Sequence, residues 1–327
     1  MTETESSAGD LALEAKVLNK AYGKLVALRD LTFTARAGEV VGLLGPNGAG
    51  KTTAIRVLTT ILAPTSGSFA VAGIPHTRPE QIRARIGVLP ESAGYPDQQT
   101  GGEFLRYYAR LFGHSRASAR TAASALLQEV GLEGREASLI ATYSRGMRQR
   151  LGIARALIND PAVVFLDEPT LGLDPAGQRQ VLGLVERIAR ERRATVLLST
   201  HFLTEVEDTC SRVLILHRGR VIAAGTVAEV TRLAGVPRRG RFRVPADLRE
   251  RAIQILDQID SVGDAQALDG RPDWLTVILN ADESQRAHGA EIGEAVSALA
   301  ASGVPLLAFE LEGARLSDAF LSLTDDG

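Results

Sequence analysis

The stretch that decides the fold is Gly45-Pro46-Asn47-Gly48-Ala49-Gly50-Lys51-Thr52-Thr53. It fits the phosphate-binding loop pattern G-x-x-x-x-G-K-[ST] from Gly45 to Thr52. Glycines let the backbone turn tightly, so that several N–H groups point at phosphate oxygens at the start of a helix. In this pattern Lys51 neutralises the β- and γ-phosphates, and Thr52 offers its hydroxyl to Mg²⁺. The stretch therefore predicts a nucleoside triphosphate site.

The segments on either side of this loop supply the context that the motif needs. Residues 40–44 are apolar and predict a buried strand, and residues 53–58 predict a helix with one apolar face. A glycine-rich turn that binds nothing is the alternative. Because pattern, strand and helix agree, we favour the nucleotide site.

Length and composition indicate a globular protein. The chain has 327 residues, 45% of them hydrophobic and 23% charged, which is typical of a soluble protein with room for two domains. Its apolar runs are far shorter than the ~18 to 20 residues of a membrane helix. The first ten residues are acidic and polar, so no secretory signal is visible and we expect a cytoplasmic protein. Cys210 is the only cysteine, which excludes an internal disulfide framework.

Charge divides the chain into two parts. Residues 1–240 carry 30 Lys and Arg against 23 Asp and Glu, whereas residues 241–327 carry 7 against 16. The run Gly-Val-Pro-Arg-Arg-Gly at 235–240 predicts a linker between them. We expect a disordered N-terminus over 1–12, a nucleotide-binding domain over 13–235 and an acidic accessory domain over 241–327. The basic surplus is scattered and lacks an aromatic stripe, so no nucleic-acid partner is expected.

The order of predicted elements indicates an α/β protein. Strands at 13–44, 66–74, 86–91, 163–166, 195–199 and 212–217 alternate with a helical region near 92–160 and a helix over 176–192. Thr100 and Glu103 form a capping box at the start of one of these helices. This succession predicts a parallel sheet covered by helices. Beyond residue 240 the order β-α-β-β-α-β, ending in a further helix, predicts a small ferredoxin-like domain.

Two adjacent acids end the apolar strand 163–166. Open α/β sheets bind ligands at the carboxyl ends of their strands, so Asp167 is placed to hold Mg²⁺ on the phosphates, directly or through water. Glu168 points to the opposite side of the strand and can polarise a water for attack on the γ-phosphate. Such a strand also occurs by chance, but the upstream phosphate loop favours the functional interpretation.

A second motif is Tyr143-Ser144-Arg145-Gly146-Met147. A serine cap followed by a glycine leaves backbone N–H groups free for an anion at a helix start. Taken alone, it predicts only the start of a helix. Lying between the phosphate loop and the acidic strand, however, it resembles the signature of the ATP-binding cassette (ABC) family.

The resemblance covers residues 13–235 and implies a P-loop NTPase fold with a parallel-sheet core, an antiparallel β subdomain and a helical subdomain near 92–160. It implies that two copies stack head to tail, so that the signature of one closes over ATP held by the other. It also implies a catalytic role for Lys51, Glu168 and His201, the last as the switch histidine. ATP and Mg²⁺ are the implied ligands, with Thr52, Asp167 and Glu91 on the metal side.

The resemblance assigns nucleotide binding to Tyr22, which matches the adenine-stacking aromatic, to Gly45, Pro46, Asn47, Gly48, Ala49, Gly50, Lys51, Thr52 and Thr53, and to Ser144 and Gly146 of the other copy. It places Ser144, Arg145, Gly146 and Asp174 at the dimer interface. The chain departs from the family pattern at Arg145 and Met147, which replace glycine and glutamine, and at Glu91, which replaces glutamine.

These variants and the extra C-terminal domain resemble the cassettes that serve bacterial exporters with separate membrane permeases, including drug and polysaccharide exporters. The resemblance implies a protein held at the inner face of the membrane through its permease. One alternative is a soluble cassette ATPase that acts on DNA or ribosomes, although the chain has neither heptad insertions nor a second cassette. Another is a phosphotransferase, which would give the Ser144 motif no role. The transported substrate is not indicated.

Overall fold

The computed structural model describes residues 11–234, 238–268, 270–279, 290–312 and 315–324. Contacts divide the chain into two compact units, Met1–Val227 and Ala228–Gly327. The division falls before the predicted linker because helix α8 (Val227–Leu233) groups with the second unit. Residues 235–237 of that linker lie outside the described residues, and the following three residues begin a strand instead. The predicted disordered N-terminus also lies outside them up to residue 10, while Leu11 and Ala12 are already in a strand.

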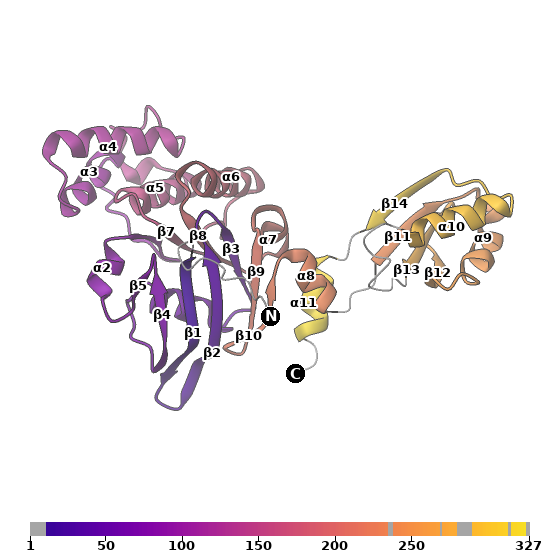
Figure 1. Ribbon diagram of the computed structural model, residues 1–327. Coiled ribbons are helices and arrows are strands. Elements are labelled where there is room, and N and C mark those ends of the chain that lie inside the picture. Colours follow the sequence, from indigo (N-terminus) through magenta and orange to yellow (C-terminus); the bar gives the residue numbers. More distant parts are fainter. Residues whose placement is uncertain (1–10, 235–237, 269, 280–289, 313–314, 325–327) are drawn as a thin grey trace, which may run out of the picture. The chain divides into compact units, whose positions relative to one another are not determined.

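A six-stranded sheet forms the centre of the first unit, in the order β10-β9-β3-β8-β7-β6 (Figure 1). Its strands are β3 (Val40–Leu44), β6 (Ile86–Leu89), β7 (Val163–Asp167), β8 (Thr195–Thr200), β9 (Arg212–His217) and β10 (Arg220–Gly225). All neighbours run parallel except the edge pair β9 and β10. Every residue of β3, β7 and β8 is buried, as expected for parallel strands covered on both faces. The predicted parallel sheet is confirmed.

A smaller antiparallel sheet lies beside it, in the order β2-β1-β4-β5. It contains β1 (Leu11–Tyr22), β2 (Leu25–Arg36), β4 (Ser66–Val71) and β5 (Ile74–Pro75). The prediction of one strand over 66–74 is wrong. Ala72 and Gly73 have φ of 50° and 73°, so the chain reverses there into a hairpin.

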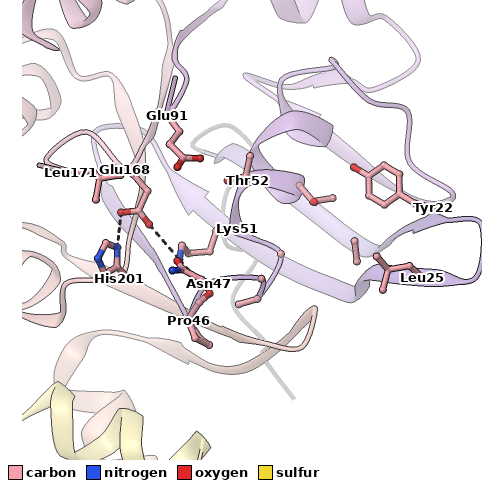
Figure 2. A pocket seen from close by; sticks show the side chains of 15 residues that line it. Tyr22, Leu25, Pro46, Asn47, Lys51, Thr52, Glu91, Glu168, Leu171 and His201 are labelled. Carbon is pink, nitrogen blue, oxygen red and sulfur yellow. Dashed lines mark hydrogen bonds and ion pairs between the residues drawn. The ribbon is translucent and has the colours of Figure 1, made fainter. Parts of the chain in front are cut away.

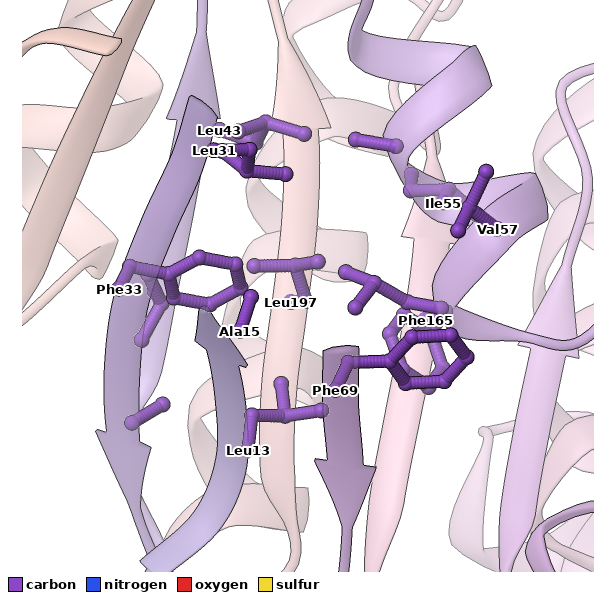
Figure 3. Packing of buried hydrophobic residues seen from close by; sticks show 14 of the residues in the cluster. Leu13, Ala15, Leu31, Phe33, Leu43, Ile55, Val57, Phe69, Phe165 and Leu197 are labelled. Atoms are coloured by element: carbon purple, nitrogen blue, oxygen red, sulfur yellow. The ribbon is translucent and has the colours of Figure 1, made fainter. Parts of the chain in front are cut away.

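The core of this unit lies between the two sheets and helix α1 (Lys51–Leu58). Leu13, Phe33 and Phe69 of the antiparallel sheet belong to the same cluster as Phe165 and Leu197 of the central sheet (Figure 3). The apolar side chains of α1 are also buried in this cluster. Because this packing holds α1, it fixes the phosphate loop that joins β3 to α1.

The described part of the first unit also contains the helices α2 (Pro79–Arg83), α3 (Gly101–Leu111), α4 (Arg116–Glu129), α5 (Arg145–Leu157), α6 (Pro175–Arg192) and α7 (Leu203–Thr209). The predicted capping box is confirmed at α3, where Glu103 N donates to Thr100 Oγ1 at 3.2 Å and Thr100 N to Glu103 Oε2 at 2.9 Å. Helices α5, α6 and α7 contact the central strands β6, β8 and β3. The sequence prediction missed α2 and α7, which are too short for a clear period. It also missed β10, in which only Ala223 and Gly225 are buried.

The second unit contains β11 (Arg238–Arg243), α9 (Arg249–Leu256), β12 (Val262–Ala267), β13 (Trp274–Leu279), α10 (Ala290–Ala301), β14 (Ala308–Glu312) and α11 (Leu316–Thr324). Its antiparallel sheet has the order β12-β13-β11-β14. This is the predicted ferredoxin-like arrangement. Phe242, Leu275 and Val277 of the sheet and Leu256 and Leu299 of the helices form its core.

Candidate active site

The loop between β3 and α1 leaves the start of α1 without a side-chain cap. Gly50 is the N-cap, with φ of 107°, and has no side chain that could accept a hydrogen bond. By contrast, α3, α4, α5 and α6 each begin with a side-chain oxygen that accepts a backbone N–H. A Cβ on Gly50 would lie 2.6 Å from Ala27 O, so only glycine fits there. The first turn of α1 therefore keeps N–H donors that an anion can use.

A pocket of about 500 Å³ opens above this loop (Figure 2). Tyr22 and Leu25 lie on one side of the loop, and Glu168 and His201 on the other (Figure 2). This volume suits a small organic ligand, with an apolar end beside Tyr22 and a charged end beside Glu168. The complete lining consists of Tyr22, Leu25, Ala27, Pro46, Asn47, Gly48, Ala49, Gly50, Lys51, Thr52, Thr53, Glu91, Glu168, Leu171 and His201.

Lys51 lies at the charged end of the pocket. Its Nζ donates to Gly45 O at 2.6 Å and lies 3.3 Å from Glu168 Oε1. Both side chains are buried, and a buried ammonium or carboxylate is stable only when it is paired. Lys51 and Glu168 therefore neutralise each other beside the phosphate loop (Figure 2).

Oxygen ligands converge next to this pair. Thr52 Oγ1 donates to Asp167 Oδ1 at 3.3 Å, and Ser199 Oγ donates to the same oxygen at 2.5 Å. Hydroxyl and carboxylate oxygens are the ligands that Mg²⁺ prefers, so this donor set fits that ion. Glu91, from the loop after β6, lines the same pocket. Of the three residues predicted for the metal, Thr52 and Glu91 line the pocket, and Asp167 is hydrogen-bonded to Thr52 without lining it.

Glu168 is held in a strained position. Its φ is 50°, a left-handed conformation that costs a non-glycine residue roughly 1 kcal/mol or more. Its N–H donates to both Ser199 O and Ser199 Oγ, each at 3.1 Å. Its Oε2 lies 2.9 Å from His201 Nδ1 (Figure 2). The structure therefore brings together the three residues predicted as catalytic, with Glu168 between Lys51 and His201.

The predicted dimer-interface residues do not line this pocket. Ser144 Oγ accepts from Met147 N at 3.2 Å, and Asp174 Oδ1 accepts from Gly177 N at 3.0 Å, so each caps its own helix. The guanidinium of Arg145 lies over Gly172, where an added Cβ would be 2.6 Å from its Cζ. In a single chain the interface residues belong to segments apart from the phosphate loop.

Sequence reasoning missed several residues of the site. Leu25 and Ala27 line the pocket without belonging to any motif, and Leu171, at the start of the segment that contains Asp174, was not predicted to line it. Ser199 fixes both acids, and its signal was a polar residue at the end of an apolar strand shortly before His201. Such a residue is buried only if it has hydrogen-bond partners, which the sequence does not identify.

Comparisons with known proteins agree with this geometry. The ABC transporter family model matches residues 28–171. The doxorubicin resistance ATP-binding protein DrrA of Mycobacterium tuberculosis (strain CDC 1551 / Oshkosh) is 40% identical over 229 residues, which are 69% of this chain and 69% of that protein. The chain belongs to the ABC transporter family.

Two further relatives of this ABC protein extend the comparison. The daunorubicin resistance ATP-binding protein DrrA2 of Streptomyces coeruleorubidus is 36% identical over 321 residues, 96% of this chain and 95% of that protein. A dimeric ATP-binding cassette, solved in a post-hydrolysis state with ADP and Pi, is 26% identical with a TM-score of 0.60, and the match covers 65% of this chain and 98% of that chain.

The family confirms an ATP-binding P-loop NTPase of the ABC type with ATPase activity. The predicted function as the ATP-binding and hydrolysing subunit of an ABC transporter is confirmed over the alternative that acts on DNA or ribosomes. Within the part of the chain that the structure describes, none of the helices has the length and apolar composition that crossing a membrane requires.

Proposed function

We propose that two copies of this chain hydrolyse ATP in a head-to-tail dimer and thereby drive a separate membrane permease, with Glu168 as the general base. The observation that carries this proposal is the position of Glu168, 3.3 Å from Lys51 Nζ and 2.9 Å from His201 Nδ1 at the charged end of the pocket. A base needs a fixed carboxylate within reach of a water beside the γ-phosphate.

Lys51 links binding to activation of this base. In the structure the Lys51 ammonium is paired with Glu168. A triphosphate on the phosphate loop offers Lys51 a stronger, multiply charged partner. Glu168 then loses a cation that competes for its carboxylate oxygen, and this oxygen can accept a proton from water. His201 remains on the other carboxylate oxygen and keeps Glu168 oriented.

Thr52 and Asp167 are the residues that would hold Mg²⁺, with Glu91 also on the wall of the pocket. The ion supplies neutralisation of the phosphate charge when it is bound. Ser199 holds Asp167 through its hydroxyl, so this carboxylate is oriented before the ion arrives.

Tyr22 serves the other end of the nucleotide. With 43% of its surface exposed, it offers a ring face for the adenine base beside Leu25. The phosphate loop lines the pocket between Tyr22 and the charged end at Glu168 (Figure 2).

The second copy would close the open side of the pocket. Ser144 Oγ accepts from its own helix but keeps its O–H as a donor, and Gly146 leaves room for a close approach to phosphate. Asp174 would lie on the same contact surface. A solved relative that is dimeric with ADP and Pi bound supports the formation of a dimer. Since the relatives are named for drug resistance, we assign the chain to export, at the inner face of the membrane through its permease.

The variant Glu168→Gln tests this proposal. The amide cannot accept a proton, so hydrolysis should fall by about 10²- to 10⁴-fold while ATP still binds. With ATP and Mg²⁺, size-exclusion chromatography should then show a trapped dimer. Glu186→Gln, the same change at an exposed position of α6, is the matched control. A Glu168→Gln protein that stayed monomeric and hydrolysed ATP at the control rate would refute the assignment.

A further inference from the structure

A buried carboxylate that the proposed mechanism does not use joins the loops that carry Glu168 and His201. Glu205, on helix α7, is only 5% exposed. Its Oε2 accepts a hydrogen bond from Thr170 Oγ1 at 2.9 Å and another from Thr200 Oγ1 at 2.8 Å. Both threonines are completely buried. One carboxylate oxygen therefore joins two segments that follow from different strands of the central sheet.

These two segments carry the proposed catalytic residues. Thr170 lies two residues after Glu168, in the loop that follows β7. Thr200 directly precedes His201 at the end of β8. The Thr200 hydroxyl also accepts from Phe202 N at 3.0 Å, so it fixes the turn on both sides of His201. A continuous set of hydrogen bonds thus runs from this turn through Glu205 to the loop of Glu168.

Packing alone does not explain a carboxylate at this position. The second oxygen, Oε1, is buried and has no hydrogen-bond partner among the described residues. The pKa of Glu205 is raised, because burial outweighs the hydroxyls of Thr170 and Thr200, which lower it; the charge of Glu168 raises it further, and that of His201 lowers it. An apolar side chain of this size would avoid that desolvation cost. Glu205 provides an acceptor for two hydroxyl groups, which an apolar side chain lacks.

We propose that Glu205 is a positioning residue. Through its hydrogen bonds to Thr170 and Thr200 it fixes the loops that carry Glu168 and His201 relative to one another. The inference rests on the proposed roles of Glu168 and His201. Without the acceptor, two buried hydroxyls lose their partner, and the loops shift to find others. Because Glu205 does not line the nucleotide pocket, its removal affects the catalytic step and leaves nucleotide binding intact.

Two substitutions of similar size separate hydrogen bonding from packing. In Glu205→Gln the amide oxygen still accepts both hydroxyls, so kcat should stay within about 3-fold of wild type. In Glu205→Met the acceptor is absent, and kcat should fall by about 10- to 100-fold, as expected for a small displacement of catalytic groups. The ATP dissociation constant should change by less than about 2-fold in both, because the phosphate loop is intact.

Val206→Ala is the matched control for a loss of stability. Val206 is the next residue on α7, is fully buried and packs against Gly42 of β3. The substitution should lower Tm but leave kcat unchanged at a temperature where the protein is folded. Hydrogen exchange of full-length protein should speed up over 168–173 and 200–204 in Glu205→Met and not in Val206→Ala.

The outcomes decide between positioning and packing. If Glu205→Gln loses as much activity as Glu205→Met, or if Val206→Ala loses as much at an equal drop in Tm, the positioning role is refuted. The same holds if Glu205→Met keeps the wild-type kcat while Glu168→Gln is inactive. An active Glu168→Gln would instead overturn the proposed base, and the exchange measurement would still report on the link between the loops.

Discussion

The starts of α1 and α5 differ in how the N–H groups of the first turn are satisfied. At α1 the N-cap is Gly50, and no side chain accepts an N–H of the first turn. At α5 the N-cap is Ser144, whose hydroxyl accepts from Met147 N at 3.2 Å. The first helix start has donors without a side-chain acceptor, and the second is partly satisfied within its own chain.

This difference indicates an order of events. The start of α1 lies in a pocket that is also lined by Lys51 and Thr52, so we propose that one chain binds ATP there. The start of α5 does not line that pocket and would meet phosphate only when a second copy closes over it. Changes at α1 should therefore weaken binding itself, whereas changes at α5 should leave binding intact and reduce hydrolysis.

Among the variants that test this difference between α1 and α5, Lys51→Met should have the largest effect. The substitution removes the cation of the α1 side and leaves the buried Glu168 without its lysine partner. Loss of charge-assisted bonds worth about 3 kcal/mol weakens ATP binding by about 100-fold. Isothermal titration calorimetry of the full-length protein measures the dissociation constant for ATP. Near-wild-type affinity would show that Lys51 at the start of α1 is not needed for ATP binding. The proposed difference between the starts of α1 and α5 would then be wrong.

A pair of variants at Ser144 tests the α5 side. Asn and Asp cap a helix about as well as Ser, so Ser144→Asn and Ser144→Asp should both keep the wild-type Tm. The Ser144→Asp variant would place a negative charge against the γ-phosphate, and a repulsion of about 2 kcal/mol lowers hydrolysis by about 30-fold.

Ser144→Asn, the neutral control, should stay within about 3-fold of the wild-type rate. ATP affinity measured by calorimetry should be the same in Ser144→Asn, Ser144→Asp and wild type, because one chain binds without α5. A drop in affinity for Ser144→Asp alone would mean that α5 contributes to binding before closure. Equal hydrolysis in the two variants would show that the start of α5 does not approach phosphate.

The sequence predicted those parts of the site that local chemistry encodes. The phosphate loop, the two acids at the end of β7 and the cap at Ser144 depend on a few neighbouring residues, and each lies at the end of the element that the pattern indicates. The hairpin at Ala72 and Gly73 was missed because an alanine with φ of 50° has no signature in the sequence.

Residues that act through long-range contacts could not be predicted. Glu205 is one acid among several in a short helix, and its importance depends on two threonines, one of them 35 positions away in the chain. The same holds for Ser199, whose partners Asp167 and Glu168 lie on the neighbouring strand and the loop after it. The topology of the fold brings these groups together, and the sequence pattern of a single segment does not reveal that topology.

The smallest expected effect concerns Glu91. It lines the pocket from the loop after β6 and belongs to neither of the two helix starts. A carboxylate beside a triphosphate is repelled unless Mg²⁺ lies between them, so Glu91 can act only from the metal side. Glu91→Gln keeps an oxygen ligand and should keep most activity. Glu91→Ala should raise the Mg²⁺ concentration for half-maximal hydrolysis by about 3-fold, equivalent to about 0.65 kcal/mol.

Titration of Mg²⁺ at fixed ATP gives the midpoints for these variants. Asp97→Ala, a loss of charge further along the same loop and outside the pocket lining, is the control. Its midpoint should equal that of wild type, because the Asp97 carboxylate lies outside the pocket lining and 3.9 Å from Arg148, with which it pairs. A Glu91→Ala protein with the midpoint of this control would leave Glu91 as a solvated loop residue, and the metal site would then consist of Thr52 and Asp167, which lie beside the start of α1.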